Sequence, residues 1–287
     1  MTRNYIRKYA IRPVLFFAVL LLLGVALSGC GKKTAIGLVT KASKKLERVN
    51  SAQGNVGVNL LFGYDIGITR GSIPIGAEFS YEYTVEPAVM HLDGAVKLPF
   101  AESALEAYIL EEGGSAVTYV KTLGHWFKQT SGVAESMGSA AQEQKPDALQ
   151  LLTALLKLGS EMTLAEELGS CNGREAYVIT LTVTGETLKQ LLTATGISIN
   201  ELIMAEHVDY SKVSADVTIY IDKETEMLGG IFLDIKGMEQ FIDISLLGMS
   251  FGSFESLTVS MNYTGFDTVE AIVLPEEAKG APEMPSA

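Results

Sequence analysis

Cysteine and histidine are scarce in this sequence, which has two cysteines and three histidines among 287 residues. Cys30 follows an N-terminal apolar stretch, and this position predicts that the cysteine is modified. Cys171 then has no partner for an intramolecular disulfide in the mature protein. The stability of the mature domain must therefore come from a hydrophobic core. No CxxC pair is present, and the histidines are scattered without metal-ligand spacing; they are His91, His125 and His207.

Phosphate loops and calcium loops are also missing. The glycine-rich stretch 63–76 has neither the GxGxxG nor the GxxxxGK spacing, so we expect a loop or a connection between strands there. Asp222, Glu224 and Glu226 alternate along the chain, but they lack the glycine and the twelve-residue ligand spacing of a calcium loop. These absences favour a protein that is not an enzyme, with no catalytic residue, no cofactor and no metal site.

Long apolar runs are limited to one, at residues 14–27. The run is too short for a comfortable transmembrane helix, which needs about 20 apolar residues. The preceding residues include no acidic side chain and four basic ones, which is the charge pattern of an export signal; the basic residues are Arg3, Arg7, Lys8 and Arg12. We therefore predict a cleaved signal rather than a membrane span.

The run ends in Leu27, Ser28, Gly29 and Cys30, which resembles the bacterial lipobox. This pattern predicts cleavage between Gly29 and Cys30, with a lipid attached to the cysteine sulfur. Two or three acyl chains form a stable membrane anchor, whereas a single chain binds reversibly. The alternative is an ordinary signal peptide followed by a chance cysteine. The first interpretation gives a signal peptide at residues 1–29, and a lipidated cysteine with a short tether at residues 30–33.

The charge balance is strongly acidic once the signal is removed. The mature chain keeps 18 of the 22 basic residues and all 34 acidic ones, which gives a formal net charge of −16. Coulomb repulsion then disfavours nucleic acid and anionic headgroups as general partners. Lys32 and Lys33 lie beside the anchor, where they either relieve this repulsion locally or belong to a solvated linker.

The periodicity of apolar residues predicts mostly strands. Residues 35–49 have helical spacing and begin the mature chain with a short amphipathic helix. Period-2 alternation, which is typical of strands, is clearest at Phe79, Tyr81 and Tyr83. Further helices are predicted at 146–158, 186–195 and 200–206, a surface loop at 130–144, and a hairpin at Asn172-Gly173. Further strands are predicted at 56–60, 105–109, 117–119, 161–168, 174–183, 217–221, 231–235, 242–246 and 257–263.

This order of elements predicts an α+β fold in which a large curved antiparallel sheet carries short helices on its concave face. A single domain over residues 34–275 is expected, followed by a polar C-terminal tail at residues 276–287. A tandem pair of smaller sheets is the alternative, because the two halves of the chain have a similar order of elements.

Four stretches resemble a known group of lipoproteins: KASKKLERVNSAQG, REAYVITLTVTGETLKQLL, IYIDKET and SLTVSMNYTGFDTVEAIVLPEEA. With the lipobox, their pattern is similar to lipoproteins of the LppX and LprG type and to the related LolA and LolB carriers. The resemblance implies an incomplete β-barrel that wraps helices and encloses an apolar cavity for acyl chains. It implies no catalytic residues.

Two functions follow from these observations. The first is a lipid-anchored extracytoplasmic protein of the cell membrane that binds a lipid or another apolar ligand in a half-barrel cavity. The second is a structural or protein-interaction lipoprotein of the cell envelope with a solid core. Strand residues that would line the cavity in the first case, and fill the core in the second, are Phe79, Tyr81, Tyr83, Ile179, Leu181, Ile219 and Ile221.

Overall fold

The computed structural model describes residues 33–65, 69–131, 147–158, 161–194, 209–238, 245–246, 249–250 and 252–284. The chain divides into two units, Met1–Thr34 and Ala35–Ala287, and the account below concerns the second. The predicted signal peptide with Gly29 and Cys30, nearly all of the surface loop 130–144 and the predicted helix 200–206 lie outside the described residues.

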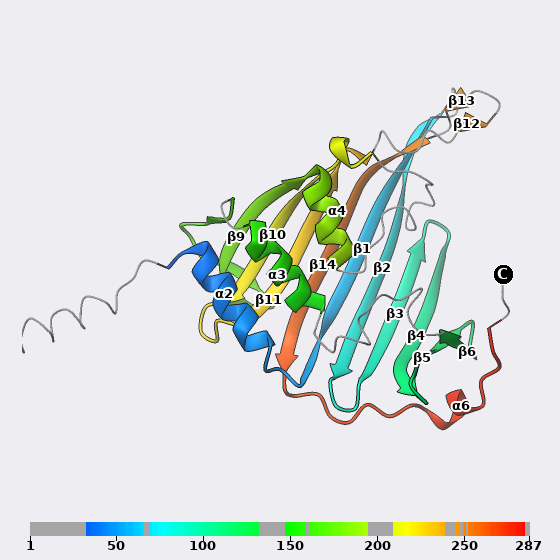
Figure 1. Cartoon of the computed structure of the whole chain (residues 1–287). Coiled ribbons are helices and arrows are strands. Elements are labelled where there is room, and N and C mark those ends of the chain that lie inside the picture. The colour runs from blue at the N-terminus through cyan, green and yellow to red at the C-terminus, as the bar shows by residue number, and fades with distance from the viewer. Residues whose placement is uncertain are drawn as a thin grey trace, which may run out of the picture. The chain divides into compact units, whose positions relative to one another are not determined.

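One antiparallel sheet of 12 strands forms the framework of this unit (Figure 1). Its strands follow the order β6-β5-β4-β3-β2-β1-β14-β11-β10-β9-β7, and β8 pairs with β9. A separate pair, β12 (Ser245–Leu246) and β13 (Met249–Ser250), lies outside this sheet. The strands of the sheet are β1 (Ser51–Asp65), β2 (Arg70–Thr84), β3 (Val89–Leu98), β4 (Ala101–Glu112), β5 (Ser115–Thr122), β6 (His125–Ser131), β7 (Thr163–Leu164), β8 (Gly169–Cys171), β9 (Arg174–Thr184), β10 (Ser214–Asp222), β11 (Leu228–Lys236) and β14 (Gly252–Phe266).

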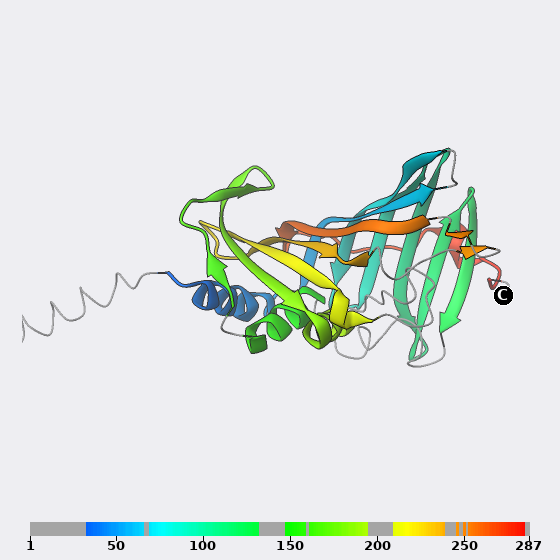
Figure 2. The ribbon, with the colours of Figure 1, turned by 90° about the horizontal axis from the view of Figure 1, so that it is seen from above.

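The first and the last long strands join the two halves of the chain. Val58 on β1 lies opposite Val259 on β14, and the same valine lies opposite Ala77 on β2. Strands β1 and β14 therefore sit side by side in the middle of a continuous sheet. The sheet is curved and open (Figure 2), so the predicted α+β fold is confirmed and the alternative of two smaller sheets is wrong.

The turns and glycines show where local sequence determines the strand ends. Asn172 and Gly173 both have positive φ angles, 53° and 75°, and form the predicted tight turn between β8 and β9. The loop or strand connection predicted at 63–76 is shorter than expected, because β1 ends at Asp65, β2 begins at Arg70 and the rest of the stretch is paired, with Tyr64 opposite Gly71. Gly63 and Gly71 fit in these strands because side chains of Glu255 and Tyr64 occupy the space beside them.

Three helices pack on the concave face of the sheet (Figures 1 and 2). Helix α2 contacts β10 and β11, α4 contacts β9 and β10, and α3 lies between α2 and α4. No helix in the described part of the chain is long and apolar enough to cross a membrane. The helices are α2 (Ala35–Leu46), α3 (Asp147–Leu158), α4 (Gly185–Ala194), the 3-10 turn η1 (Tyr210–Lys212) and α6 (Glu276–Lys279).

The main core lies between these three helices and the strands beneath them. Leu46 of α2, Leu152 of α3 and Leu188 of α4 are fully buried in it, together with inward side chains of β9, β10 and β11. Each helix places its leucines on one face, which is the arrangement expected of an amphipathic helix on a sheet.

A second, smaller core lies on the opposite, outer face of the sheet. Its centre is Trp126 on β6 and Tyr108 on β4, and Ala278 of α6 is completely buried against it. Residues 276–284, predicted as a polar tail, pack here: the backbone N–H of Lys128 donates to the carbonyl oxygen of Pro282 at 2.8 Å. Val117 and Tyr119, the apolar residues that mark β5 in the sequence, also face this outer core.

Candidate apolar binding face of the sheet

The concave face of the sheet carries rows of side chains that cross its strands. Cross-strand partners share a face, so the register defines each row. Val56, Phe79, Gly94 and Leu105 form one row across β1, β2, β3 and β4. The next rows along the strands are Gly54, Tyr81, Leu92, Ala107 and Val120, and Ala52, Tyr83, Met90 and Ile109.

Helices cover one half of this concave face. The four predicted site residues on β9 and β10 lie beneath the helices, where Ile179, Ile219 and Ile221 have no exposed surface and Leu181 is 6% exposed. Their contacts are with the main core. These four side chains therefore pack with each other and with the helix leucines, on the half of the concave face that the helices cover.

The predicted site residues on β2 lie on the other half. Tyr81 is buried, with its ring edge-on to Tyr263 at a centroid distance of 5.8 Å. Phe79 and Tyr83 on the same strand are only half-buried. Among the described helices, α2 contacts β10 and β11, and α4 contacts β9 and β10. Neither these two helices nor α3 between them makes a comparable contact with β2–β5. Of the predicted set, Tyr81 thus belongs to the main core with the four residues on β9 and β10, and Tyr83 packs against that core. Phe79 lies outside both cores of the described residues.

Several neighbours of Phe79 on this face were not among the predicted site residues. These apolar side chains share the concave face and are half-buried, yet they belong to neither core. Together with Phe79, these residues are Met90, Val96, Leu105, Ile109, Val120 and Phe127. The sequence pointed to two of them, because the alternation at residues 105–109 predicted the strand that carries Leu105 and Ile109.

Gly94 determines how Phe79 lies on this face. A β-carbon at Gly94 would stand 2.7 Å from a ring carbon of Phe79 and 2.0 Å from the carbonyl oxygen of Glu78. The ring of Phe79 therefore packs closely against the backbone of Gly94 on the next strand, which only glycine permits.

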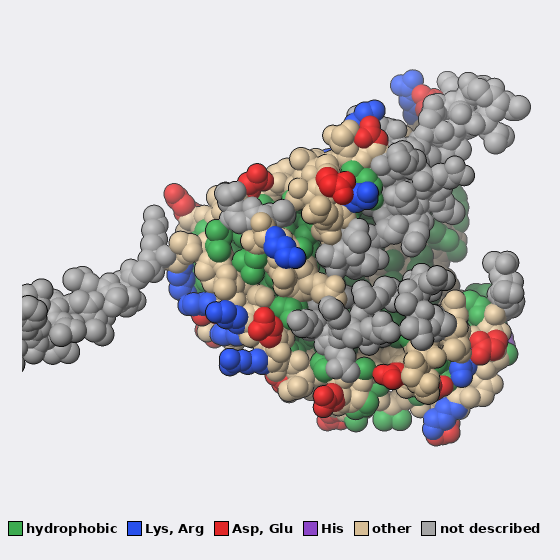
Figure 3. Space-filling view, in the orientation of Figure 1, with side chains coloured by type: hydrophobic (Ala, Val, Ile, Leu, Met, Phe, Trp, Pro, Cys, Tyr) green, Lys and Arg blue, Asp and Glu red, His purple; other side chains and the backbone are tan. Residues whose placement is uncertain are grey.

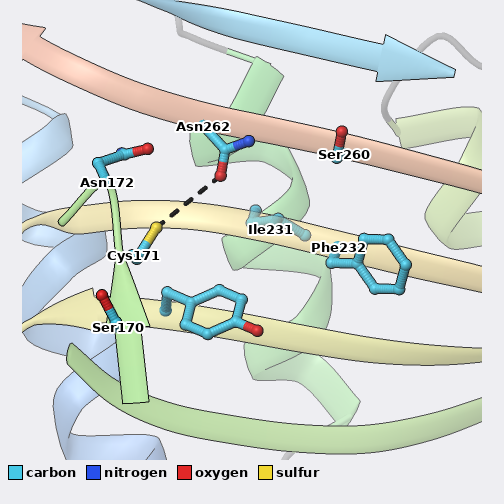
Figure 4. A pocket seen from close by; sticks show the side chains of 8 residues that line it. Ser170, Cys171, Asn172, Ile231, Phe232, Ser260 and Asn262 are labelled. Atoms are coloured by element: carbon cyan, nitrogen blue, oxygen red, sulfur yellow. Dashed lines mark hydrogen bonds between the residues drawn. The ribbon is translucent and has the colours of Figure 1, made fainter. Parts of the chain in front are cut away.

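The outer face holds a small polar pocket of about 250 Å³ beside the β8–β9 hairpin (Figure 4). The Cys171 thiol donates to Oδ1 of Asn262 at 3.8 Å, and Nδ2 of Asn172 donates to the carbonyl oxygen of Tyr263 at 2.8 Å. Gly229 and Gly230 leave the room that the cysteine side chain occupies. Burial raises the pKa of the Cys171 thiol despite the opposing charge of Arg174, so this cysteine is not an activated nucleophile.

His91, one of the few residues with catalytic potential, lies on the outer face. Its ring stacks on Tyr108 at 4.4 Å, and its Nε2 atom is 3.5 Å from a carboxylate oxygen of Glu106. Burial, with the Glu106 charge, raises the pKa of Tyr108 to about 12. The described residues include no group of three histidine, cysteine or carboxylate side chains that could hold a metal ion.

The string GMSFG at residues 248–252 has the spacing of a serine-hydrolase elbow, which requires a sharp strand-to-helix turn around the serine. Ser250 instead lies in β13, which pairs with β12 and is followed by the strand β14. The local backbone is therefore not that of a nucleophile elbow.

Comparison with protein families gives one match, over residues 34–283, to a family of unknown function, DUF6612. The chain belongs to this family. The match spans the whole described sheet of this DUF6612 protein, from α2 to the segment beside β6. A search of curated protein sequences gives no match.

Solved structures that resemble this DUF6612 chain include three from bacteria. LprF from Mycobacterium bovis has 12% identity and a TM-score of 0.42, with 85% of this chain and 99% of that chain covered. The lipoprotein LppX from Mycobacterium tuberculosis has 12% identity and a TM-score of 0.40, with 84% and 100% covered. A LolA superfamily protein from Nitrosomonas europaea has 12% identity and a TM-score of 0.21, with 86% and 97% covered. LppX and LolA are among the groups that the sequence pattern resembles.

Proposed function

We propose that this protein is a membrane-anchored extracytoplasmic lipoprotein that binds a lipid or another apolar ligand on the concave face of its sheet. The observation that carries the proposal is the half-buried apolar surface over β2–β5, which begins at Phe79 on β2 and belongs to neither core. Apolar surface that is withheld from a core is costly to leave in water, and contiguous patches of it commonly mark binding sites.

The anchor at Cys30 is the second part of the proposal. It is supported by the basic, acid-free N-terminus, the short apolar run and the Leu-Ser-Gly-Cys sequence. An apolar ligand has low solubility in water, so a carrier held next to a bilayer is close to the source of its ligand. No chemical step is required of the protein in this function.

Ligand binding can be tested on the protein purified with its native lipids. Native mass spectrometry and organic extraction should detect a co-purifying lipid, and a dansyl-labelled fatty acid should bind with saturation. Phe79→Gln and Ile109→Gln should each weaken binding of the probe about tenfold, because a polar group then lies in the apolar contact. Ser80→Gln, on the outer face of the same strand, is the matched control. Absence of both lipid and saturable probe binding would refute the ligand proposal.

Anchoring can be tested separately by growing cells with an alkyne-labelled fatty acid. The label should appear on the mature protein and be lost in Cys30→Ser, which should also leave the membrane fraction. Cys171→Ser removes the other cysteine and should keep both the label and the membrane location. Labelling that survives Cys30→Ser would contradict the proposed anchor.

A protein-interaction function is the second candidate, because apolar side chains are exposed at two turns. Phe100 is 98% exposed and Leu123 is 85% exposed. They lie in the β3–β4 and β5–β6 turns, which share one end of the sheet because these strands are consecutive and antiparallel. Phe100→Ser with Leu123→Ser should remove a partner in cross-linking on intact cells, while binding of the fatty-acid probe stays unchanged.

A further inference from the structure

The basic residues of the mature chain are concentrated next to the proposed anchor. Residues 30–50 contain six of the 18 lysines and arginines but only one of the 34 acidic residues. The remaining residues, 51–287, contain 12 basic and 33 acidic side chains. A protein that is acidic overall therefore has a cationic end. Figure 3 shows Lys and Arg side chains gathered along α2.

Helix α2 directs these charges to one side. Its apolar face, with Leu38, Val39 and Leu46, is buried in the main core. Lys41, Lys44, Lys45 and Arg48 recur at intervals of three and four residues in or just beyond the helix, so they share its solvent-exposed side.

The members of this basic group differ in how they are paired. Nζ of Lys41 lies 3.4 Å from Glu226, and Nζ of Lys45 donates to the carbonyl oxygen of Thr225. Both contacts are with the turn between β10 and β11 at the side of the helix. Lys44 and Arg48 are exposed and form no ion pair within the described residues. Two cations of the group therefore remain available for an anionic partner.

The position of α2 in the chain indicates which anion this is. Residues 31–34 connect Cys30 to the helix, and four residues span at most about 14 Å even when fully extended. Anionic headgroups attract lysine and arginine within about a Debye length of the surface, which is about 8–10 Å. The anchor thus permits the basic side of α2 to lie against the bilayer surface, where this attraction would hold it.

We propose that the basic outer side of α2, centred on Lys44 and Arg48, rests on the anionic phospholipid headgroups of the membrane in which Cys30 is anchored. The inference rests on the anchor of the proposed function and adds an orientation to it. Helix α2 contacts β10 and β11 on the concave side of the sheet (Figures 1 and 2), and its basic side borders the turn between these two strands.

Lysine labelling of the lipidated protein on vesicles tests this orientation. The protein is placed in phosphatidylcholine vesicles with or without 30% phosphatidylglycerol and acetylated with an N-hydroxysuccinimide ester, and each lysine is quantified by peptide mass spectrometry. Lys44 should react about fivefold more slowly on the anionic vesicles, and 0.5 M NaCl should remove the difference. Lys97 and Lys236 on the outer face of the sheet are internal controls, and their rates should not change with vesicle composition.

A charge-reversed variant completes the test. In Lys44→Glu/Arg48→Glu, the protection of Lys41 on anionic vesicles should disappear, whereas Lys97→Glu/Lys236→Glu should keep it. Equal labelling of Lys44 on both kinds of vesicle, or equal protection of Lys97, would overturn the inference. The mass of the Cys30 peptide shows in the same experiment whether the lipid is present, so failure of the anchor is distinguished from failure of the orientation.

Discussion

Tyr81 lies across Gly54 on the neighbouring strand, with its hydroxyl oxygen 2.8 Å from the position that a β-carbon on Gly54 would take. The two residues are direct partners in the β1–β2 pair. The same β-carbon would stand 1.9 Å from the carbonyl oxygen of Asn262 on β14. Glycine at this position therefore allows three strands to pack closely where the two halves of the sheet meet.

Replacing Gly54 by alanine should destabilise the protein. The added carbon must displace backbone as well as the tyrosine ring, so we expect a loss of about 2 kcal/mol or more in the free energy of unfolding. Gly280→Ala is the matched control, because a β-carbon there meets no atom within 4 Å. Urea denaturation, monitored by circular dichroism, measures the free energy of unfolding of both variants. Equal midpoints for the two variants would contradict the close packing at Gly54.

Asp222 should make the stability depend on pH. Its Oδ1 atom accepts hydrogen bonds from the backbone N–H of Thr225 at 2.7 Å and of Glu224 at 3.1 Å, and Arg174 lies 3.3 Å from Oδ2. Burial acts to raise the pKa of this carboxyl, but the hydrogen bonds and Arg174 outweigh it, so the pKa lies below its ordinary value.

The lowered pKa of Asp222 determines how stability changes with pH. A carboxyl whose pKa is lower in the folded state stabilises the fold above its unfolded pKa of about 3.9, and this contribution is lost as the pH falls through the folded pKa. Asp222→Asn should therefore cost about 1–3 kcal/mol at pH 7, with a difference from the wild type that shrinks below pH 4. Asp234→Asn, in an exposed ion pair with Lys236, should change stability by less than about 1 kcal/mol. A pH-independent difference would refute the assignment to Asp222.

Local patterns predicted the elements that depend on neighbours in sequence. The alternation of Phe79, Tyr81 and Tyr83 identified β2, and Asn172-Gly173 identified the β8–β9 turn. Pairing between strands that are about 200 residues apart in the chain leaves no local pattern in the sequence. The contact of Val58 with Val259, which makes one sheet rather than two, is visible only in the structure.

The candidate site was predicted only in part for a related reason. Phe79 and Ile219 have the same strand periodicity, because alternation reveals an apolar face but not what covers it. Coverage depends on where α2, α3 and α4 pack, and they place Ile219 in the core while leaving Phe79 half-buried. Gly63 and Gly71 were misleading because they make room for side chains of adjacent strands.

The C-terminal segment should act as part of the domain rather than as a free tail. Trp126 is the only tryptophan and is 8% exposed beneath this segment. Ala278→Glu places a charge at a position with no exposed surface, so the segment should detach and tryptophan fluorescence should shift to longer wavelength with stronger acrylamide quenching. Glu277→Gln on the exposed side of α6 should leave the spectrum unchanged. An unchanged spectrum in Ala278→Glu would show that the segment does not cover Trp126.

Cys171 should react slowly with alkylating reagents, although one side of it faces a pocket. Its thiol is half-buried and donates to Asn262, and burial raises its pKa above the ordinary value. The thiolate is the reactive form, so the rate of alkylation should rise with a midpoint above the pH of about 8.5 that is typical of free cysteine. Iodoacetamide labelling of the mature Cys30→Ser chain, which has this single thiol, gives the pH profile directly. The same chain in 8 M urea should regain the profile of glutathione, because unfolding restores water around the sulfur. A folded chain that reacts as fast as glutathione at pH 7 would instead mean that Arg174 outweighs burial and activates the thiol.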